Sequence, residues 1–227
     1  MLAAVIALAG CAAPGPVDNP VGRRLTWFSY VNGDGLRATC TTGAPDRYRL
    51  VYNGIYTEEV RAIDLYVRSD GGAEVAVRIK RPPNFLAGLS LTDVFAPWRA
   101  TVLRAAFAPA TVRALTARLA AAGAFGPPPE GLSLNSSRFY WVVAGCHEGR
   151  FFFNAYAYPS ARFARLGLID LFERALPKAP PFNRPRALGP PVLPTQCSSR
   201  RDPRPECLEP PFLFTVGKHG LVGNLAL

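Results

Sequence analysis

The residues of this sequence that come nearest to a catalytic or metal-binding motif are His147-Glu148. A zinc-protease helix needs a second histidine three residues after the glutamate, and that position is Phe151. The pair also lies between two segments that alternate like strands, so we expect a polar hairpin turn whose side chains point to solvent. His219, the other histidine, lies in a Gly-rich C-terminal segment without a recognisable partner. His147 is therefore not expected to be catalytic.

Other motifs with possible chemistry are equally incomplete. Glu58 and Glu59 are adjacent, and neighbours on a strand point to opposite faces, so we interpret them as a charged strand start and not as paired acids. Ser90 and Ser133 follow Gly-Leu, but neither completes Gly-x-Ser-x-Gly. The segment 33–35 lacks the third glycine of a dinucleotide loop. The sequence thus predicts no cofactor and no metal, and it does not indicate an enzyme.

Apolar alternation with a period of two predicts an antiparallel sheet built of hairpins. Its clearest segment is 74–80, where Val75, Val77 and Ile79 alternate with other residues. The predicted strands are 25–31 and 36–40 around a turn at 32–35, then 48–52, 60–68, 74–80, 138–144 and 150–158, with an edge strand at 212–216. The stretch 84–107 is ambiguous, with a strand or helix near 100–106.

Two segments show helical spacing. One begins after Pro109 and ends near Gly123, with Val112, Leu115 and Leu119 on one face. The second begins with Ser160 as N-cap, and its apolar face is Phe163, Leu166, Ile169 and Phe172. Eleven prolines between 177 and 211 favour an extended surface segment. The predicted fold is α+β: an antiparallel sheet of hairpins with two packed helices and a Pro-rich C-terminal wrap.

The hairpin predicted from strands 138–144 and 150–158 is rich in aromatic residues. Its two faces can be interpreted in two ways. The aromatic residues are Phe139, Tyr140, Trp141, Phe151, Phe152, Phe153, Tyr156 and Tyr158. Either the sheet is covered on both sides, with the Pro-rich tail as the second cover, or one aromatic face is free to bind a glycan or a protein. We favour the covered sheet.

Near its start the chain carries Leu8-Ala9-Gly10-Cys11 after a short apolar run, with no basic residue before Cys11. This motif resembles the lipobox of bacterial lipoproteins. The resemblance implies that residues 1–10 are a signal peptide, apparently truncated, and that Cys11 carries the lipid. It also implies a protein anchored in the bacterial cell envelope and facing the periplasm. The Pro-containing stretch from Cys11 to residue 23 would be the tether.

The remaining four cysteines fit an oxidising compartment, where an even number indicates disulfides. Three connectivities are possible. Cys197 and Cys207 are close in sequence and flank a polar loop, so we favour that pair, which leaves Cys40 with Cys146.

The net charge of +10 predicts attraction to anionic lipids or polymers. Nucleic acid, the other usual partner of a basic chain, does not fit the export signal. Arg200, Arg201 and Arg204 lie in the loop between the last two cysteines and are candidate anion-binding residues. Residues 24–176 are the expected α+β domain, and 177–227 the C-terminal extension. We expect an envelope lipoprotein that binds an anionic polymer or a partner protein; the alternative is a hydrolase acting on cell-wall or lipid material.

Overall fold

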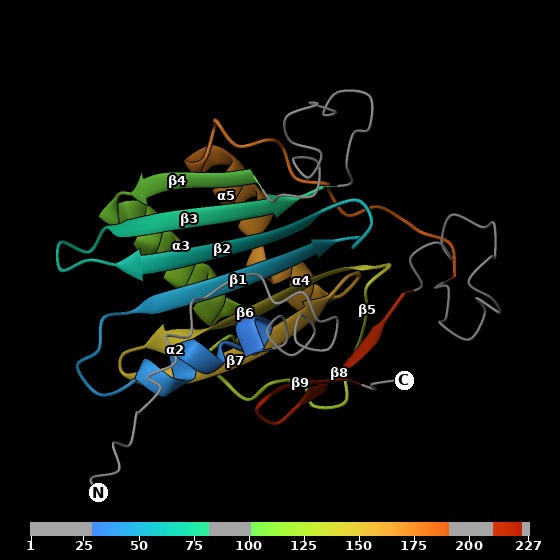
Figure 1. Cartoon of the computed structure of the whole chain (residues 1–227), viewed down its shortest axis with the longest axis horizontal. Helices are drawn as coiled ribbons and strands as arrows, with labels where there is room; N and C mark the ends of the chain where they lie inside the picture. Colours follow the sequence, from blue (N-terminus) through green and yellow to red (C-terminus); the bar gives the residue numbers. More distant parts are fainter. Residues whose placement is uncertain (1–28, 82–100, 191–210, 224–227) are drawn as a thin grey trace, which may run out of the picture.

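The computed structural model describes residues 29–81, 101–190 and 211–223. The α+β prediction is confirmed: a six-stranded antiparallel sheet carries helices on its faces, and a three-stranded sheet lies beside it (Figure 1). The strands are β1 (Arg47–Gly54), β2 (Val60–Val67), β3 (Ala73–Lys80), β4 (Thr101–Phe107), β5 (Ser133–Asn135), β6 (Phe139–His147), β7 (Arg150–Ala157), β8 (Leu213–Gly217) and β9 (Gly220–Gly223). The helices are α2 (Asp34–Thr39), α3 (Pro109–Ala121), α4 (Ala161–Leu166) and α5 (Leu168–Ala175).

The main sheet has the strand order β4-β3-β2-β1-β6-β7. The first four strands form a meander, and after α3 the chain returns to add the β6–β7 hairpin beside β1. In this register Arg49 of β1 lies between Asp64 of β2 and Ala144 of β6. The ambiguous stretch contains a strand, β4, at 101–107, and its earlier part lies outside the described residues.

Helices α3, α4 and α5 cover one face of the main sheet, which we call the inner face (Figure 1). The predicted apolar stripe of α3 is confirmed, since Val112, Leu115 and Leu119 are all buried. Ser160 is the N-cap of α4, as expected, and its hydroxyl accepts a hydrogen bond from the amide of Phe163. The single helix expected there is two helices, because Gly167 has a left-handed backbone with φ 51° and interrupts the helical path.

The N-terminal hairpin prediction, with strands at 25–31 and 36–40, is wrong for the described residues. Residues 29–32 and α2 are both helical, and Gly33 separates them with φ 72°. Asn-Gly favours positive φ both in hairpin turns and at helix breaks, so the motif did not decide between them. A Cβ on Gly33 would lie 2.8 Å from that of Ala144, so the glycine lets this segment approach β6 closely.

The opposite, outer face is covered over β1, β6 and β7 by residues 29–39 and by the small sheet, whose order is β5-β8-β9. The predicted edge strand at 212–216 is therefore the centre of this sheet, as β8. The expectation that the aromatic hairpin is covered on both sides is confirmed. Within the C-terminal extension, Phe182 of the Pro-rich segment packs into the core of the inner face, while Phe214 and Leu221 of the small sheet supply part of the outer cover.

The predicted disulfide Cys40–Cys146 is confirmed, with its Cα atoms 5.4 Å apart. It joins the residue that follows α2 to β6 and so fastens the N-terminal helical segment to the sheet. The predicted Cys197–Cys207 pair lies outside the described residues.

Candidate functional site

The strand ends of β1 and β6 bring together His147, Asp46 and Tyr48. The imidazole Nδ1 lies 2.6 Å from Asp46 Oδ2 and 2.9 Å from the Tyr48 hydroxyl oxygen. The Tyr48 hydroxyl donates to the same Asp46 oxygen at 2.6 Å, and the Glu148 amide donates to the other at 2.9 Å. Phe125 stacks on the imidazole with ring centroids 4.2 Å apart. His147 is therefore fixed from three sides.

This geometry corrects the turn prediction. Cys146 and His147 belong to β6, and the turn consists of Glu148 and Gly149. The His147 side chain does not point freely to solvent, since it is only 22% exposed. Sequence reasoning missed Asp46 because it is 101 residues away. A signal was present: a Cys40–Cys146 bond places the chain just after Cys40 near His147.

Electrostatics favour a charged Asp46. Burial alone would raise the pKa of its carboxyl group, but hydrogen bonds from Tyr48, His147 and the Glu148 amide hold that pKa below its ordinary value of 3.8. A proton on Nδ1 donating to Asp46 leaves Nε2 as the free acceptor of the ring. An imidazole oriented in this way can act as a general base or accept a ligand hydrogen bond.

A second polar cluster lies where β2 begins on the inner face. Arg61 and Glu59, each 1% exposed, form a two-point ion pair, with Nε to Oε1 at 2.6 Å and Nη2 to Oε2 at 2.9 Å. Arg61 also donates to the carbonyls of Pro180 and Pro181. The charged strand start predicted at Glu58 and Glu59 is thus a buried ion pair at Glu59. It anchors the Pro-rich segment.

A third cluster lies on the outer face around Asp64. Its carboxylate accepts from Arg49 at 2.7 Å, from Arg78 at 2.6 Å and from the Tyr30 hydroxyl at 2.8 Å. Arg49 lies over the Tyr30 ring, 3.6 Å from its centroid. The outer face of β1 to β4 around this cluster is rich in cations. Among the described strands, the charged side chains on this face are Arg47, Arg49, Asp64, Glu74, Arg78, Lys80 and Arg104.

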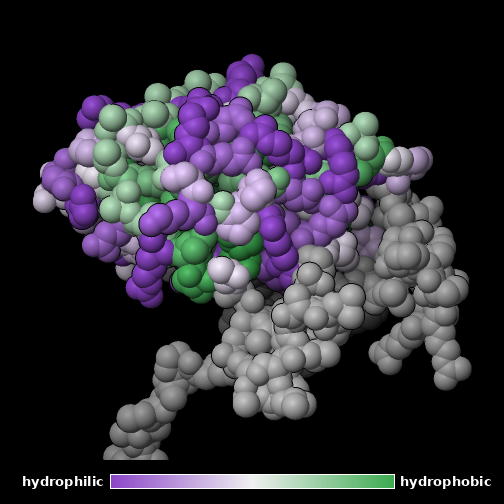
Figure 2. All heavy atoms as spheres, turned by 90° about the horizontal axis from the view of Figure 1, so that it is seen from above, coloured by the Kyte–Doolittle hydropathy of each residue, from purple (hydrophilic) through white to green (hydrophobic). Residues whose placement is uncertain are grey.

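Aromatic rings accompany these cations. The Arg47 guanidinium lies 5.6 Å from the centroid of the Tyr66 ring, and Lys80 Nζ lies 3.9 Å from that of Tyr56. Tyr66 is 44% exposed and Val102 is 52% exposed. Figure 2 looks onto the molecule from its β4 side and shows hydrophilic residues over much of the surface, with apolar patches between them. This cationic outer face can attract anions and stack against flat ligands.

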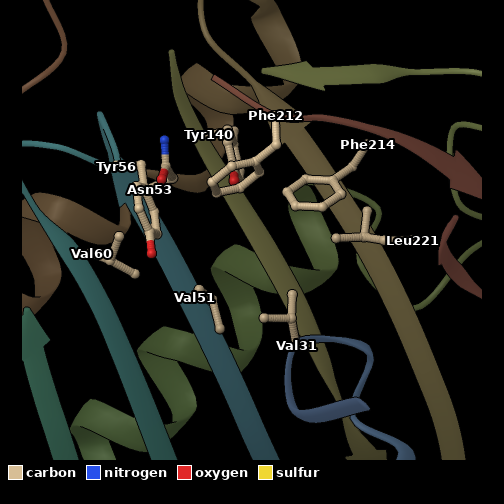
Figure 3. A pocket seen from close by; sticks show the side chains of 9 residues that line it. All are labelled: Val31, Val51, Asn53, Tyr56, Val60, Tyr140, Phe212, Phe214 and Leu221. Carbon is tan, nitrogen blue, oxygen red and sulfur yellow. The ribbon is translucent and has the colours of Figure 1, made fainter. Parts of the chain in front are cut away.

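The seam between the two sheets is almost filled by side chains. Figure 3 shows Phe212, Phe214 and Leu221 of the small-sheet region facing Val31 and Val51. The remaining space is about 10 Å³, which holds one water molecule at most. The seam is therefore a packed interface and not a ligand site.

Several predicted site residues lie outside the described part of the chain: Cys11, Cys197, Cys207, Arg200, Arg201 and Arg204. His219 is exposed in the β8–β9 turn, where its carbonyl accepts a hydrogen bond from Arg37. Within residues 29–81, 101–190 and 211–223, no cluster of three or more His, Cys, Asp or Glu side chains could hold a metal ion. The helices of these ranges include none long and apolar enough to cross a membrane.

The geometry thus offers an oriented histidine, a buried ion pair and a cationic face. Comparison with family models, curated proteins and solved structures gives no match to the chain.

Proposed function

We propose that the protein is a lipid-anchored protein of the bacterial cell envelope that binds an anionic polymer without catalysing a reaction. The observation that carries the proposal is the cationic outer face. Five cations share it with Asp64 and Glu74, and Asp64 is already neutralised by Arg49 and Arg78. Side chains two residues apart on a strand are about 7 Å apart, so Arg78 and Lys80 follow one another along β3, and Arg104 of β4 lies diagonally beside Arg78 because it pairs with Ala76. A polymer with repeated negative charges complements this arrangement of cations.

The envelope location is supported by the lipobox-like motif at Cys11 and by the disulfide. Cys40 and Cys146 are 106 residues apart, and their bond closes most of the main sheet into one loop. Disulfides of this kind persist in oxidising compartments such as the periplasm. The location is tested by membrane fractionation of cells that produce wild type or Cys11→Ala. The two proteins partitioning alike, with no lipid mass on the N-terminal peptide, would contradict the anchor.

Binding is tested with lipopolysaccharide as the anionic polymer. A triple variant, Arg47→Gln with Lys80→Gln and Arg104→Gln, removes three positive charges from the outer face. The matched control, Arg113→Gln with Arg165→Gln and Arg174→Gln, removes the same charge from exposed positions on the helices. We expect salt-sensitive binding that weakens by about tenfold or more in the first variant only. Equal weakening in both variants would show that binding depends on the net charge of the protein and not on the outer face.

A partner protein is the other binding mode compatible with this surface. Crosslinking in cells, followed by mass spectrometry, separates the two. A single captured protein that depends on Arg47, Lys80 and Arg104, together with no lipopolysaccharide binding, would favour the partner protein.

A hydrolase acting on cell-wall or lipid material is the second candidate, and the Asp46–His147 pair is the observation in its favour. The pair supplies an oriented base, although the hydroxyl of Tyr48 contacts Nδ1 and not Nε2. The test is hydrolysis of peptidoglycan fragments by wild type, His147→Ala and, as control, the exposed His219→Ala. Activity lost only in His147→Ala would replace the binding proposal.

A further inference from the structure

The two end strands of the main sheet, β7 and β4, differ in what lies along their free edges. Asn154 of β7 is buried, accepts from the Ala155 amide at 3.1 Å and donates to the Gly123 carbonyl at 3.1 Å, so the loop after α3 is held at that edge. Figure 1 shows no strand beyond β4. Within the ranges that the structure describes, no group hydrogen-bonds to the free edge of β4.

The register shows which backbone groups of β4 point away from the sheet. The Arg68 amide donates to the Gly72 carbonyl at 2.8 Å, so in this register the even-numbered residues of β2 and β3 bond to each other. The odd-numbered residues of β3 therefore bond to β4, where Val77 pairs with Leu103. The residues of β4 whose N–H and C=O groups point outward are Val102, Arg104 and Ala106.

This edge lacks most of the features that prevent a sheet from pairing with another chain, which include proline, bulges and a covering segment. β4 contains no proline and pairs with β3 residue for residue from Thr101 to Phe107. Its one charged side chain, Arg104, is exposed on the outer face and has no ion-pair partner among the described residues. Arg104 disfavours an added strand with a cation opposite to it and favours one with a carboxylate there.

The two faces of β4 define the added strand. Leu103 and Ala105 are half-buried on the inner face and pack against its core, so apolar side chains of a further strand would extend this surface. A second copy of the chain fits poorly, because two antiparallel β4 strands joined by their outward groups place both Arg104 side chains on one face, opposite or diagonal to each other. The net charge of +10 also opposes self-association.

We propose that the free edge of β4 binds an extended segment of a partner protein, in which acidic and apolar residues alternate, by β-strand addition. The acidic side chains lie beside Arg104 on the outer face, and the apolar ones lie beside Leu103 on the inner face. This interaction uses the backbone of β4 and shares only Arg104 with the proposed polymer site, so either can fail without the other.

The probe is a capped, fluorescently labelled peptide, Ser-Glu-Val-Glu-Val-Glu-Ser, whose binding is measured by anisotropy. One control peptide has Lys in place of Glu. Another is N-methylated at its three Glu residues, so it keeps the charge and loses the N–H groups that would face β4. We expect both controls to bind at least about tenfold more weakly. No binding of the first peptide, or equal binding of the N-methylated one, would overturn the proposal.

The position is tested with Val102→Pro combined with Ala106→Pro. This variant removes two outward N–H groups and leaves the bonds to β3 and every cation of the outer face in place. The control, Val102→Thr with Ala106→Thr, keeps both N–H groups. Peptide binding should weaken by about tenfold or more only in the proline variant, with lipopolysaccharide binding unchanged. Equal peptide binding by both folded variants would refute the site. Arg104→Glu, a second test, should reverse the preference between the Glu and Lys peptides.

Amide hydrogen exchange separates the possible occupants of the edge. In the free protein, the outward amides of Val102, Arg104 and Ala106 should exchange fast, and those of Leu103 and Ala105, bonded to β3, slowly. The Glu peptide should slow exchange of the outward amides. Outward amides already protected in the free protein would overturn the proposal. Protection independent of concentration would assign the edge to another segment of this chain, and protection that rises with concentration to a second copy.

Discussion

The two ion-pair clusters at β2, around Glu59 and around Asp64, have the same chemistry and different surroundings. Glu59 and Arg61 are both 1% exposed beneath the Pro-rich segment on the inner face, and the second partner of Glu59, Arg81, is 43% exposed. Asp64 is 6% exposed, but its partners Arg49 and Arg78 are 13% and 47% exposed on the outer face. The difference shows that the segment packed over a carboxylate and its partners determines how much their ion pairs contribute to stability. The buried Arg61 cannot lose its carboxylate without a large loss of stability, whereas water can replace the carboxylate at Arg49 and Arg78, which reach the surface.

Removing the charge of Glu59 should give the largest loss of stability and is the strongest test of the contrast between the two clusters. Glu59→Gln leaves Arg61 buried with its charge uncompensated, so we expect a loss of about 3–5 kcal/mol in the free energy of unfolding. Chemical denaturation measures the loss. The double variant Glu59→Met with Arg61→Met removes both charges and should lose less. A single variant as stable as wild type would show that water reaches Arg61.

The cover of the outer cluster depends on the disulfide. Cys40→Ser with Cys146→Ser releases the segment that positions Tyr30 over Asp64, and it frees a loop of more than 100 residues in the unfolded chain. The expected loss is about 2–5 kcal/mol. Denaturation with and without a reducing agent measures it. Wild type should lose the same stability on reduction, and a reduced wild type that unfolds like the oxidised protein would contradict the role of the bond.

Asp64→Asn tests the outer cluster directly. The amide removes the charge between Arg49 and Arg78 and leaves most of the side-chain volume in place. We expect a loss of about 1–3 kcal/mol, because Asp64 is buried although its partners reach water. Arg78→Gln should cost about 1 kcal/mol or less, since that side chain is half exposed. A loss for Asp64→Asn that equals that of Glu59→Gln would remove the distinction between the two clusters.

Of the carboxylates of Glu59, Asp64 and Asp46, that of Asp46 is the most exposed, at 24%. Because its pKa is held below 3.8 in the folded protein, its stabilising effect is present above the ordinary carboxyl pKa. The effect is lost as the pH falls below 3.8 towards the folded-state pKa. Denaturation curves between pH 2 and 7 should therefore show that Asp46→Asn differs from wild type at neutral pH and converges with it in acid. A difference in the free energy of unfolding that stays constant over this pH range would contradict the hydrogen bonds assigned to Asp46.

The sequence by itself determined the features that depend on neighbours along the chain. The alternation at 74–80 specifies β3, because successive side chains of a strand point to opposite faces. The spacing of Val112, Leu115 and Leu119 specifies the buried face of α3 for the same kind of reason. Counting the cysteines left three connectivities, and favouring the Cys197–Cys207 pair left Cys40–Cys146, the bond that the structure contains.

Only the tertiary structure decided which distant segments meet. Gly33 suits both a hairpin turn and a helix break, and in the structure it is the break before α2, so close to β6 that a Cβ on Gly33 would lie 2.8 Å from that of Ala144. Arg61 is buried beneath a segment about 120 residues away, since it donates to the carbonyl of Pro180, 119 residues on, and lies 3.9 Å from the centroid of the Phe182 ring. His147 faces Asp46 because the β1–β6 pairing brings together the beginning of one strand and the end of the other. These contacts depend on strand order and register, which local periodicity does not encode.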